Sequence, residues 1–154
     1  MDKGSIVLRN IKKMSDPISR DSVFQNADGM FGGYTYYPSN GVVESIINSG
    51  DFKLIQSDSL RNYLVSWKDV LKDYNMDTAI DLKLWTDEIQ SYIIKNGDFQ
   101  NLASEKNIKM LEDPVFINML VRKQFYQNNI INSMTGKNGL EHYMEEIMRL
   151  SSEE

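Results

Sequence analysis

The stretch PSNGVVESIINSGDFKLIQSDSLRNYLVSWKDVLKDY, residues 38–74, carries the helical pattern from which the fold of this chain is predicted. It predicts a short helix, a glycine stop, an apolar connector and the start of a long amphipathic helix. Ser39 is the expected N-cap of the short helix, because a serine hydroxyl accepts a hydrogen bond from an amide of the first turn. Gly50 is expected to end this helix in the left-handed conformation.

The connector and the next helix follow from the same stretch. Phe52, Leu54 and Ile55 are apolar in a segment too short for a stable strand, so we expect them to insert into the core as a plug. Ser57 or Asp58 is expected to cap the long helix, because both side chains accept from first-turn amides.

The long helix has the clearest pattern in the chain. Its apolar residues recur at steps of three and four, as in a helix with one buried face, and they begin with Leu60, Tyr63, Leu64, Trp67, Val70, Leu71 and Tyr74. No glycine or proline interrupts residues 57–96. One helix over 57–95 would be roughly 58 Å long, and a kink near 75–77 is the alternative. Trp67 and Trp85 are expected in the core.

The two ends of the chain also read as helices. Residues 5–14 resemble the last turns of a helix, and Asp16-Pro17 is a start signal for a helix to about Asn26. Asp113-Pro114 opens a last long helix over 114–150. The segment TGKNG at 135–139 weakens that helix by about 1 kcal/mol per glycine. Because the apolar register persists beyond it, we expect a continuous helix rather than a turn.

The predicted fold is therefore all-α. We expect an irregular helical bundle built on two long antiparallel amphipathic helices, 57–95 and 114–150, with shorter N-terminal helices packed across them. Residues 1–14 are predicted to be the stub of an upstream tether helix, and residues 15–154 a single helical domain.

Composition limits the function classes. The chain has 154 residues, 41% of them apolar, which is enough for one domain with a core. The net charge is −5 and no basic run exceeds Lys12-Lys13, so binding to nucleic acid or to an anionic membrane surface is not expected. The absence of cysteine excludes disulfides and thiol chemistry. No signal peptide is visible, and no apolar run approaches the ~18 residues of a membrane span.

His142 is the only histidine, and it lies among Glu141, Glu145 and Glu146. A di-iron bundle needs Glu-x-x-His on two helices and a glutamate on two more. The spacing here is Glu-His and has no second copy, so we interpret the cluster as exposed side chains, with Glu146 supporting His142 at four residues.

Other acidic residues also lack a metal-binding pattern. Asp77, Asp81, Asp87 and Glu88 follow helical spacing on what is predicted to be the solvated face. We therefore expect no catalytic residues, no metal site and no cofactor. The protein is predicted not to be an enzyme.

The longest irregular stretch is ADGMFGGYTYYPSN, residues 27–40. Its glycines do not form a phosphate loop, because the Gly-Lys-Ser/Thr ending is missing and no strand precedes it. One interpretation is a loop whose aromatic residues pack over the bundle. The other is a small binding surface for sugar or peptide, because tyrosines and glycines suit adaptable contacts. The candidate interaction surface consists of Phe31, Tyr34, Tyr36 and Tyr37.

The stretch at 38–74, called the hinge stretch below, also resembles a known family. The resemblance lies in the segments PSN (38–40), SGDFKLI (49–55), DSLRNYL (58–64) and SW (66–67), with DPVFINML (113–120) near the end. These segments resemble a bacterial family of membrane-anchored proteins known as a domain of unknown function. The similarity covers about residues 15–150. Its motifs are packing residues, and no catalytic residue is carried over from the family.

The resemblance implies a location and a role. Family members carry an N-terminal basic segment and one transmembrane helix ahead of this region. We therefore expect an extracytoplasmic domain, in the periplasm, that acts in the envelope through protein contacts or self-association, and that meets the membrane only through a missing N-terminal helix. The alternative is a sensor or binding domain for a small ligand or peptide that uses the loop at 27–40.

Overall fold

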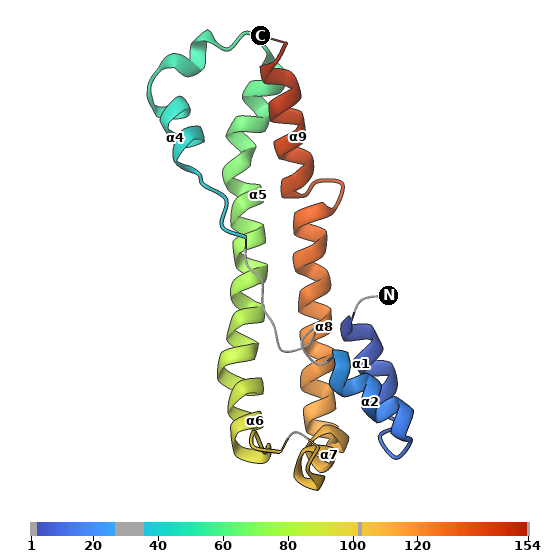
Figure 1. The fold of residues 1–154 in the computed structure, drawn as a ribbon. Coiled ribbons are helices and arrows are strands. Elements are labelled where there is room, and N and C mark those ends of the chain that lie inside the picture. Colours follow the sequence, from blue (N-terminus) through green and yellow to red (C-terminus); the bar gives the residue numbers. More distant parts are fainter. Residues whose placement is uncertain (1–2, 27–35, 102, 154) are drawn as a thin grey trace. The chain divides into compact units, whose positions relative to one another are not determined.

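A computed structural model describes residues 3–26, 36–101 and 103–153, apart from the side chain of Asp51. Every regular element within these residues is a helix (Figure 1). The predicted all-α helical fold is therefore confirmed. The bundle groups into two compact units that we describe separately. The first unit consists of the described residues of Met1–Tyr34 and Ala79–Gln127, and the second of those of Thr35–Thr78 and Asn128–Glu154. The prediction of a single domain over 15–154 stays a prediction.

The described elements follow one another in this order: α1 (Lys3–Ile11), α2 (Pro17–Asn26), α4 (Gly41–Asn48), the 3-10 helix η1 (Asp51–Leu54), α5 (Asp58–Lys83), the π-helix η2 (Leu84–Ile89), α6 (Gln90–Asn96), α7 (Glu105–Glu112), α8 (Pro114–Thr135) and α9 (Leu140–Ser151).

The first unit packs α1, α2, η2, α6 and α7 around the first half of α8. Its core consists of Val7, Ile11, Met14, Val23, Leu84, Ile89, Met110, Leu111, Phe116 and Leu120. The side-chain amide of Asn10 on α1 donates to the hydroxyl of Ser22 on α2 at 3.2 Å. Asp16 begins α2 as predicted, because its carboxylate accepts from the backbone amide of Ser19 at 3.0 Å. Val7 and Ile11 are buried, so the predicted stub contributes to this core.

The second unit packs α9 and the end of α8 against the first half of α5, with α4 and η1 beside them (Figure 1). Near the start of α5, Leu60 and Leu64 cluster with Leu150. Further along α5, Trp67 and the residues after it cluster with Leu140. Higher numbers on α5 therefore meet lower numbers on α9, so the two helices are antiparallel. Trp67 is buried, as predicted.

The predicted helix over 57–95 is continuous. The elements α5, η2 and α6 follow one another without a break from Asp58 to Asn96, and residues 75–77 are helical. The sequence pattern did not indicate the π-helix at Leu84–Ile89. A π-helix widens one turn by a residue and is frequent at functional sites. Trp85 lies in it and is half-buried against the core of the first unit.

The prediction of a continuous helix over 114–150 is wrong, because α8 ends at Thr135 and α9 begins at Leu140. A Cβ at Gly136 would lie 2.3 Å from the carbonyl oxygen of Asn132, and a Cβ at Gly139 would lie 2.6 Å from that of Met134. The turn thus needs both glycines. The turn takes four residues, close to the 3.6 of one helical turn, so the apolar register survives the break.

The hinge stretch differs from its prediction in two places. Asn40 rather than Ser39 occupies the N-cap position of α4, and its side-chain amide donates to Glu44 at 2.7 Å. Leu54 is 74% exposed and is not part of the predicted plug. Phe52 and Ile55 do pack against the cluster around Leu60.

Three predicted helix boundaries are confirmed. Gly50 follows α4 with a φ of 81°, in the left-handed region. The hydroxyl of Ser57 caps α5 by accepting from the amide of Leu60 at 3.1 Å. Asp113 accepts from the amide of Val115 at 2.8 Å, at the start of α8.

Candidate functional site

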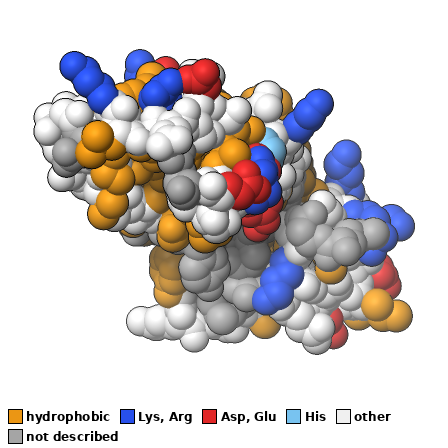
Figure 2. All heavy atoms as spheres, turned by 90° about the horizontal axis from the view of Figure 1, so that it is seen from above, with side chains coloured by type: hydrophobic (Ala, Val, Ile, Leu, Met, Phe, Trp, Pro, Cys, Tyr) orange, Lys and Arg blue, Asp and Glu red, His pale blue; other side chains and the backbone are white. Residues whose placement is uncertain are grey.

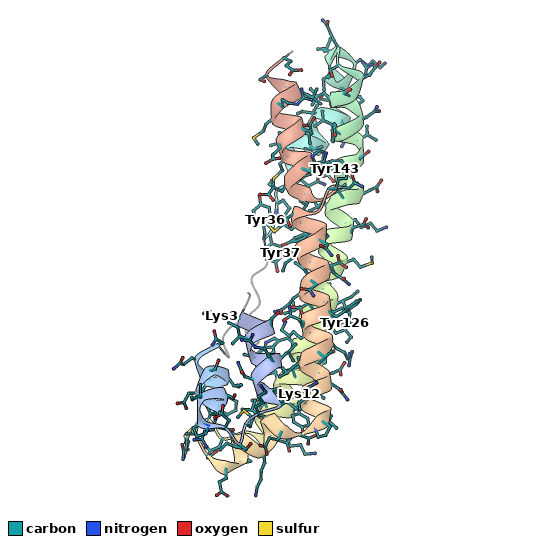
Figure 3. All side chains as sticks on the ribbon, turned by 90° about the vertical axis from the view of Figure 1, so that its right-hand side faces the viewer. Lys3, Lys12, Tyr36, Tyr37, Tyr126 and Tyr143 are labelled. Atoms are coloured by element: carbon teal, nitrogen blue, oxygen red, sulfur yellow. The ribbon has the colours of Figure 1, made fainter. Side chains whose placement is uncertain are left out.

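The aromatic surface predicted at 27–40 is partly described. Tyr36 and Tyr37 are 45% and 77% exposed, on the segment that leads into α4 (Figure 3). The backbone amide of Tyr36 donates to the phenol oxygen of buried Tyr74 at 3.0 Å, which fixes this segment to α5 within the second unit. Phe31 and Tyr34 lie outside the described residues, so the structure brings together two of the four predicted positions.

Helix α4 follows Tyr36 and Tyr37. It contains many apolar residues although its side chains are only partly buried. It contains Val42, Val43, Ile46 and Ile47 in eight residues, yet none of its residues is fully buried. Val43 packs against the second unit's core, whereas Val42 is 69% exposed. Leu54 of the adjoining η1 is exposed as well. Hydrophobic side chains gather at the left of Figure 2, in the region that α4 occupies in Figure 1.

The first unit contains a cavity of about 740 Å³. It lies among α2, η2, α6, α7 and the segment between α6 and α7, and its described lining residues are Val23, Phe24, Trp85, Gln90, Ile93, Ile94, Gly97, Asp98, Phe99, Ala103, Asn107, Met110 and Leu111. Most of these side chains are apolar. The volume falls in the range of ~300–1,000 Å³ that is typical of small-molecule sites. No pattern in the sequence indicated this cavity.

Asn107 holds one wall of this cavity together. Its side-chain oxygen accepts from the amide of Asp98 at 2.7 Å, and its side-chain nitrogen donates to the carbonyl oxygens of Asp98 and Asn101 at 2.8 and 3.1 Å. Gly97 is buried beside it, where a Cβ would lie 2.6 Å from the carbonyl oxygen of Ile93. The carboxamide of Asn107 therefore makes its hydrogen bonds within the cavity wall and is not directed at a ligand.

A buried ion pair lies in the same unit, where sequence reasoning placed a solvated residue. Both carboxylate oxygens of Asp81 accept from Nζ of Lys123, at 2.7 and 2.8 Å. The side chains are 9% and 1% exposed, so the prediction that Asp81 faces solvent is wrong. Asp87 and Glu88 are exposed, as predicted, and pair with Lys83 and Arg122.

A signal for this pair was present in the heptad register. Core positions of α5 recur at steps of four and three through Leu71, Tyr74 and Thr78, and the next position is Asp81. On α8 the same steps run from Phe116 through Leu120 to Lys123. Two opposite charges at core positions of paired helices predict a buried ion pair.

His142 lies in the second unit, in a small polar depression of about 150 Å³ lined by Asn62, Tyr63, Ser66, Asn138, His142 and Tyr143. Its Nε2 is 3.4 Å from the phenol oxygen of Tyr63. Glu146 pairs with Arg149, and this bond, with a smaller contribution from His142, holds the pKa of Glu146 below its ordinary value.

Among residues 3–26, 36–101 and 103–153, no three His, Asp or Glu side chains come together as a possible metal site. None of the described helices combines the length and the apolar character needed to cross a bilayer.

Comparison of the chain with protein-family models, with curated proteins and with solved structures found no match. The resemblance to the membrane-anchored bacterial family therefore stays a prediction.

Proposed function

We propose that this chain is a non-enzymatic helical module that binds another protein, or a second copy of itself, through α4 and the residues beside it. The observation that carries the proposal is an apolar helix that its own unit leaves without a fully buried residue. Contiguous exposed apolar surface on a soluble domain marks interaction sites.

The physical argument starts from the cost of forming α4. An isolated helix of eight residues is marginal in water, so its stability must come from packing of its apolar residues. Within the second unit this packing is partial, because Val43 contacts the core while Val42 stays exposed. A partner that covers Val42 and Leu54 would complete the burial. Tyr36 and Tyr37 extend the same segment with rings that suit protein contacts.

The test uses charge placed on this surface. We expect Val42→Asp and Leu54→Asp to abolish both concentration-dependent self-association, measured by sedimentation, and the recovery of a partner by site-specific photo-crosslinking at Tyr37. Val65→Asp is the matched control, since Val65 is a 55% exposed apolar residue on α5 of the same unit. The proposal fails if the wild type neither self-associates nor yields a crosslinked partner, or if these signals fall equally in the control.

We also propose that the protein acts at the extracytoplasmic face of a bacterial membrane. This placement is supported by the family resemblance in residues 38–67 and 113–120. Protease added to intact spheroplasts should degrade the native protein while a cytoplasmic marker survives. Equal protection of the two would remove the placement without affecting the proposed interaction surface.

A further inference from the structure

We infer that the cavity of the first unit is a binding site for a small amphiphile, with an apolar tail among α2, η2, α6 and α7 and an uncharged or cationic head group beside Asp98. This site is separate from the α4 surface, and its test does not depend on the proposed protein contact.

The apolar tail follows from the lining. Phe24, Ile93 and Met110 lie around the space, and its volume of about 740 Å³ exceeds what a single ordered water needs. Ile94 and Phe99 line the same cavity and are 63% and 66% exposed. An alkyl chain in the cavity would remove these two side chains from water, which is the favourable term in apolar binding.

The expected head group of the ligand follows from the charge of the cavity lining. Asp98 is the only ionisable side chain among the described residues that line the cavity. One of its carboxylate oxygens accepts from the amides of Gln100 and Asn101 at 3.0 and 3.1 Å, which holds the carboxylate at the segment between α6 and α7. A fixed carboxylate repels an anionic head and attracts an ammonium group or a hydroxyl donor. The net charge of −5 acts in the same direction.

Tryptophan emission reports on this cavity directly. The chain has two tryptophans, and Trp85 lines the cavity whereas Trp67 is buried in the other unit. Trp67→Phe leaves Trp85 as the sole reporter. This replacement breaks no hydrogen bond of Nε1, which is buried without a partner in the described part of the chain, so its cost is the ring volume that it removes from the second unit's core.

The probes are decylammonium and decanoate below their micelle concentrations, and decan-1-ol below its solubility limit, at pH 7 and low salt. We expect decylammonium and decanol to shift the Trp85 emission saturably and to raise the melting temperature. Decanoate should bind about two- to five-fold more weakly than decylammonium, the range of one partly exposed charge interaction. Asp98→Asn should reduce this difference between decylammonium and decanoate.

A blocking variant separates cavity binding from surface adsorption. Ala103→Phe fills the lining from an exposed position and should abolish the response. Ala79→Phe is the matched control, because Ala79 is exposed on α5 and is not a lining residue. Saturable binding in the control but not in Ala103→Phe supports the site. No response to any probe, equal binding of decanoate, or unchanged binding in Ala103→Phe overturns it.

Discussion

At the scale of single residues, the pair formed by Asp81 and Lys123 occupies core positions that an apolar side chain would normally fill. The two charges lose their hydration on burial, and the two short hydrogen bonds between them offset that loss. The pair therefore adds little net stability. It does penalise any pairing of α5 and α8 that would separate the charges, so its expected role is to specify the register within the first unit.

Substitution separates these two roles. Lys123→Met leaves the Asp81 carboxylate buried without its partner, so we expect a loss of about 3–5 kcal/mol in the free energy of unfolding. Adding Asp81→Leu should restore stability to the wild-type level or exceed it by up to ~4 kcal/mol. Chemical denaturation measures both. A double variant as unstable as the single one would contradict this account.

The neighbouring ion pair, between Arg122 and Glu88, is the control for the effect of burial. Arg122 and Glu88 join the same two stretches of helix at 2.8 Å, but their side chains are 49% and 42% exposed. Arg122→Gln should therefore cost no more than about 1 kcal/mol.

A second residue pair makes stability depend on pH. The phenol of Tyr92 donates to Asp113 at 2.5 Å, and this bond, with the amide of Val115, holds the pKa of the Asp113 carboxyl below its ordinary value of 3.8. A lowered pKa means that the folded state favours the ionised carboxylate. Its stabilising contribution is complete above pH 3.8 and is lost as the pH falls through the lower folded-state pKa.

We therefore expect Tyr92→Phe to destabilise the protein at pH 7 and to differ less from the wild type below pH 3.8. Urea denaturation at pH 7 and at pH 3 measures the two differences. Tyr126→Phe is the control for loss of a phenol hydroxyl in the same unit. An undiminished difference at pH 3 would show that the hydrogen bond to Asp113 is not its source.

At the scale of elements, local signals predicted most helix boundaries. At Asp16, Ser57 and Asp113, the side chain caps a helix by accepting a hydrogen bond from a first-turn amide. Capping residues of this type can be recognised in the sequence. Two features were beyond such signals. The break at 136–139 depends on close backbone approaches, and local periodicity carried no signal for the π-helix η2.

Two glycines at the ends of α4 allow a matched prediction, because Gly41 is its first residue and Gly50 follows its last turn. A Cβ at either Gly41 or Gly50 would meet nothing within 4 Å, so only backbone conformation distinguishes the two positions. Gly50→Ala places alanine at a φ of 81° and should cost about 1–2 kcal/mol. Gly41→Ala lies in the first turn of α4 and should be neutral or stabilise by up to ~1 kcal/mol. Urea denaturation distinguishes them, and equal effects would contradict the conformational account.

At the scale of the whole molecule, the sequence predicted the all-α class but not the grouping of contacts. Periodicity identifies which face of a helix is buried, and it does not identify which partner buries it. The cavity could not be predicted for the same reason, because its lining comes from α2, η2, α6, α7 and the segment after α6. The apolar excess of α4 was visible in its sequence, whereas its incomplete burial was not.

The grouping has a consequence for local stability. The core cluster that contains Leu120 lies wholly within the first unit, and the cluster that contains Leu140 lies wholly within the second. Both leucines are fully buried, so replacement of either by alanine should cost about 2–5 kcal/mol. Cooperative local units open separately when few contacts join them.

Native-state hydrogen exchange can show whether the two units open separately. Leu120→Ala should lower the protection of core amides in the first unit, such as that of Ile89, more than that of Trp67 in the second. Leu140→Ala should show the reverse order. Because α5 runs through both units without a break in its hydrogen bonding, each variant should still have a smaller effect across the boundary. Equal losses at both reporters in both variants would mean that the two units unfold together, as the predicted single domain over 15–154 would require.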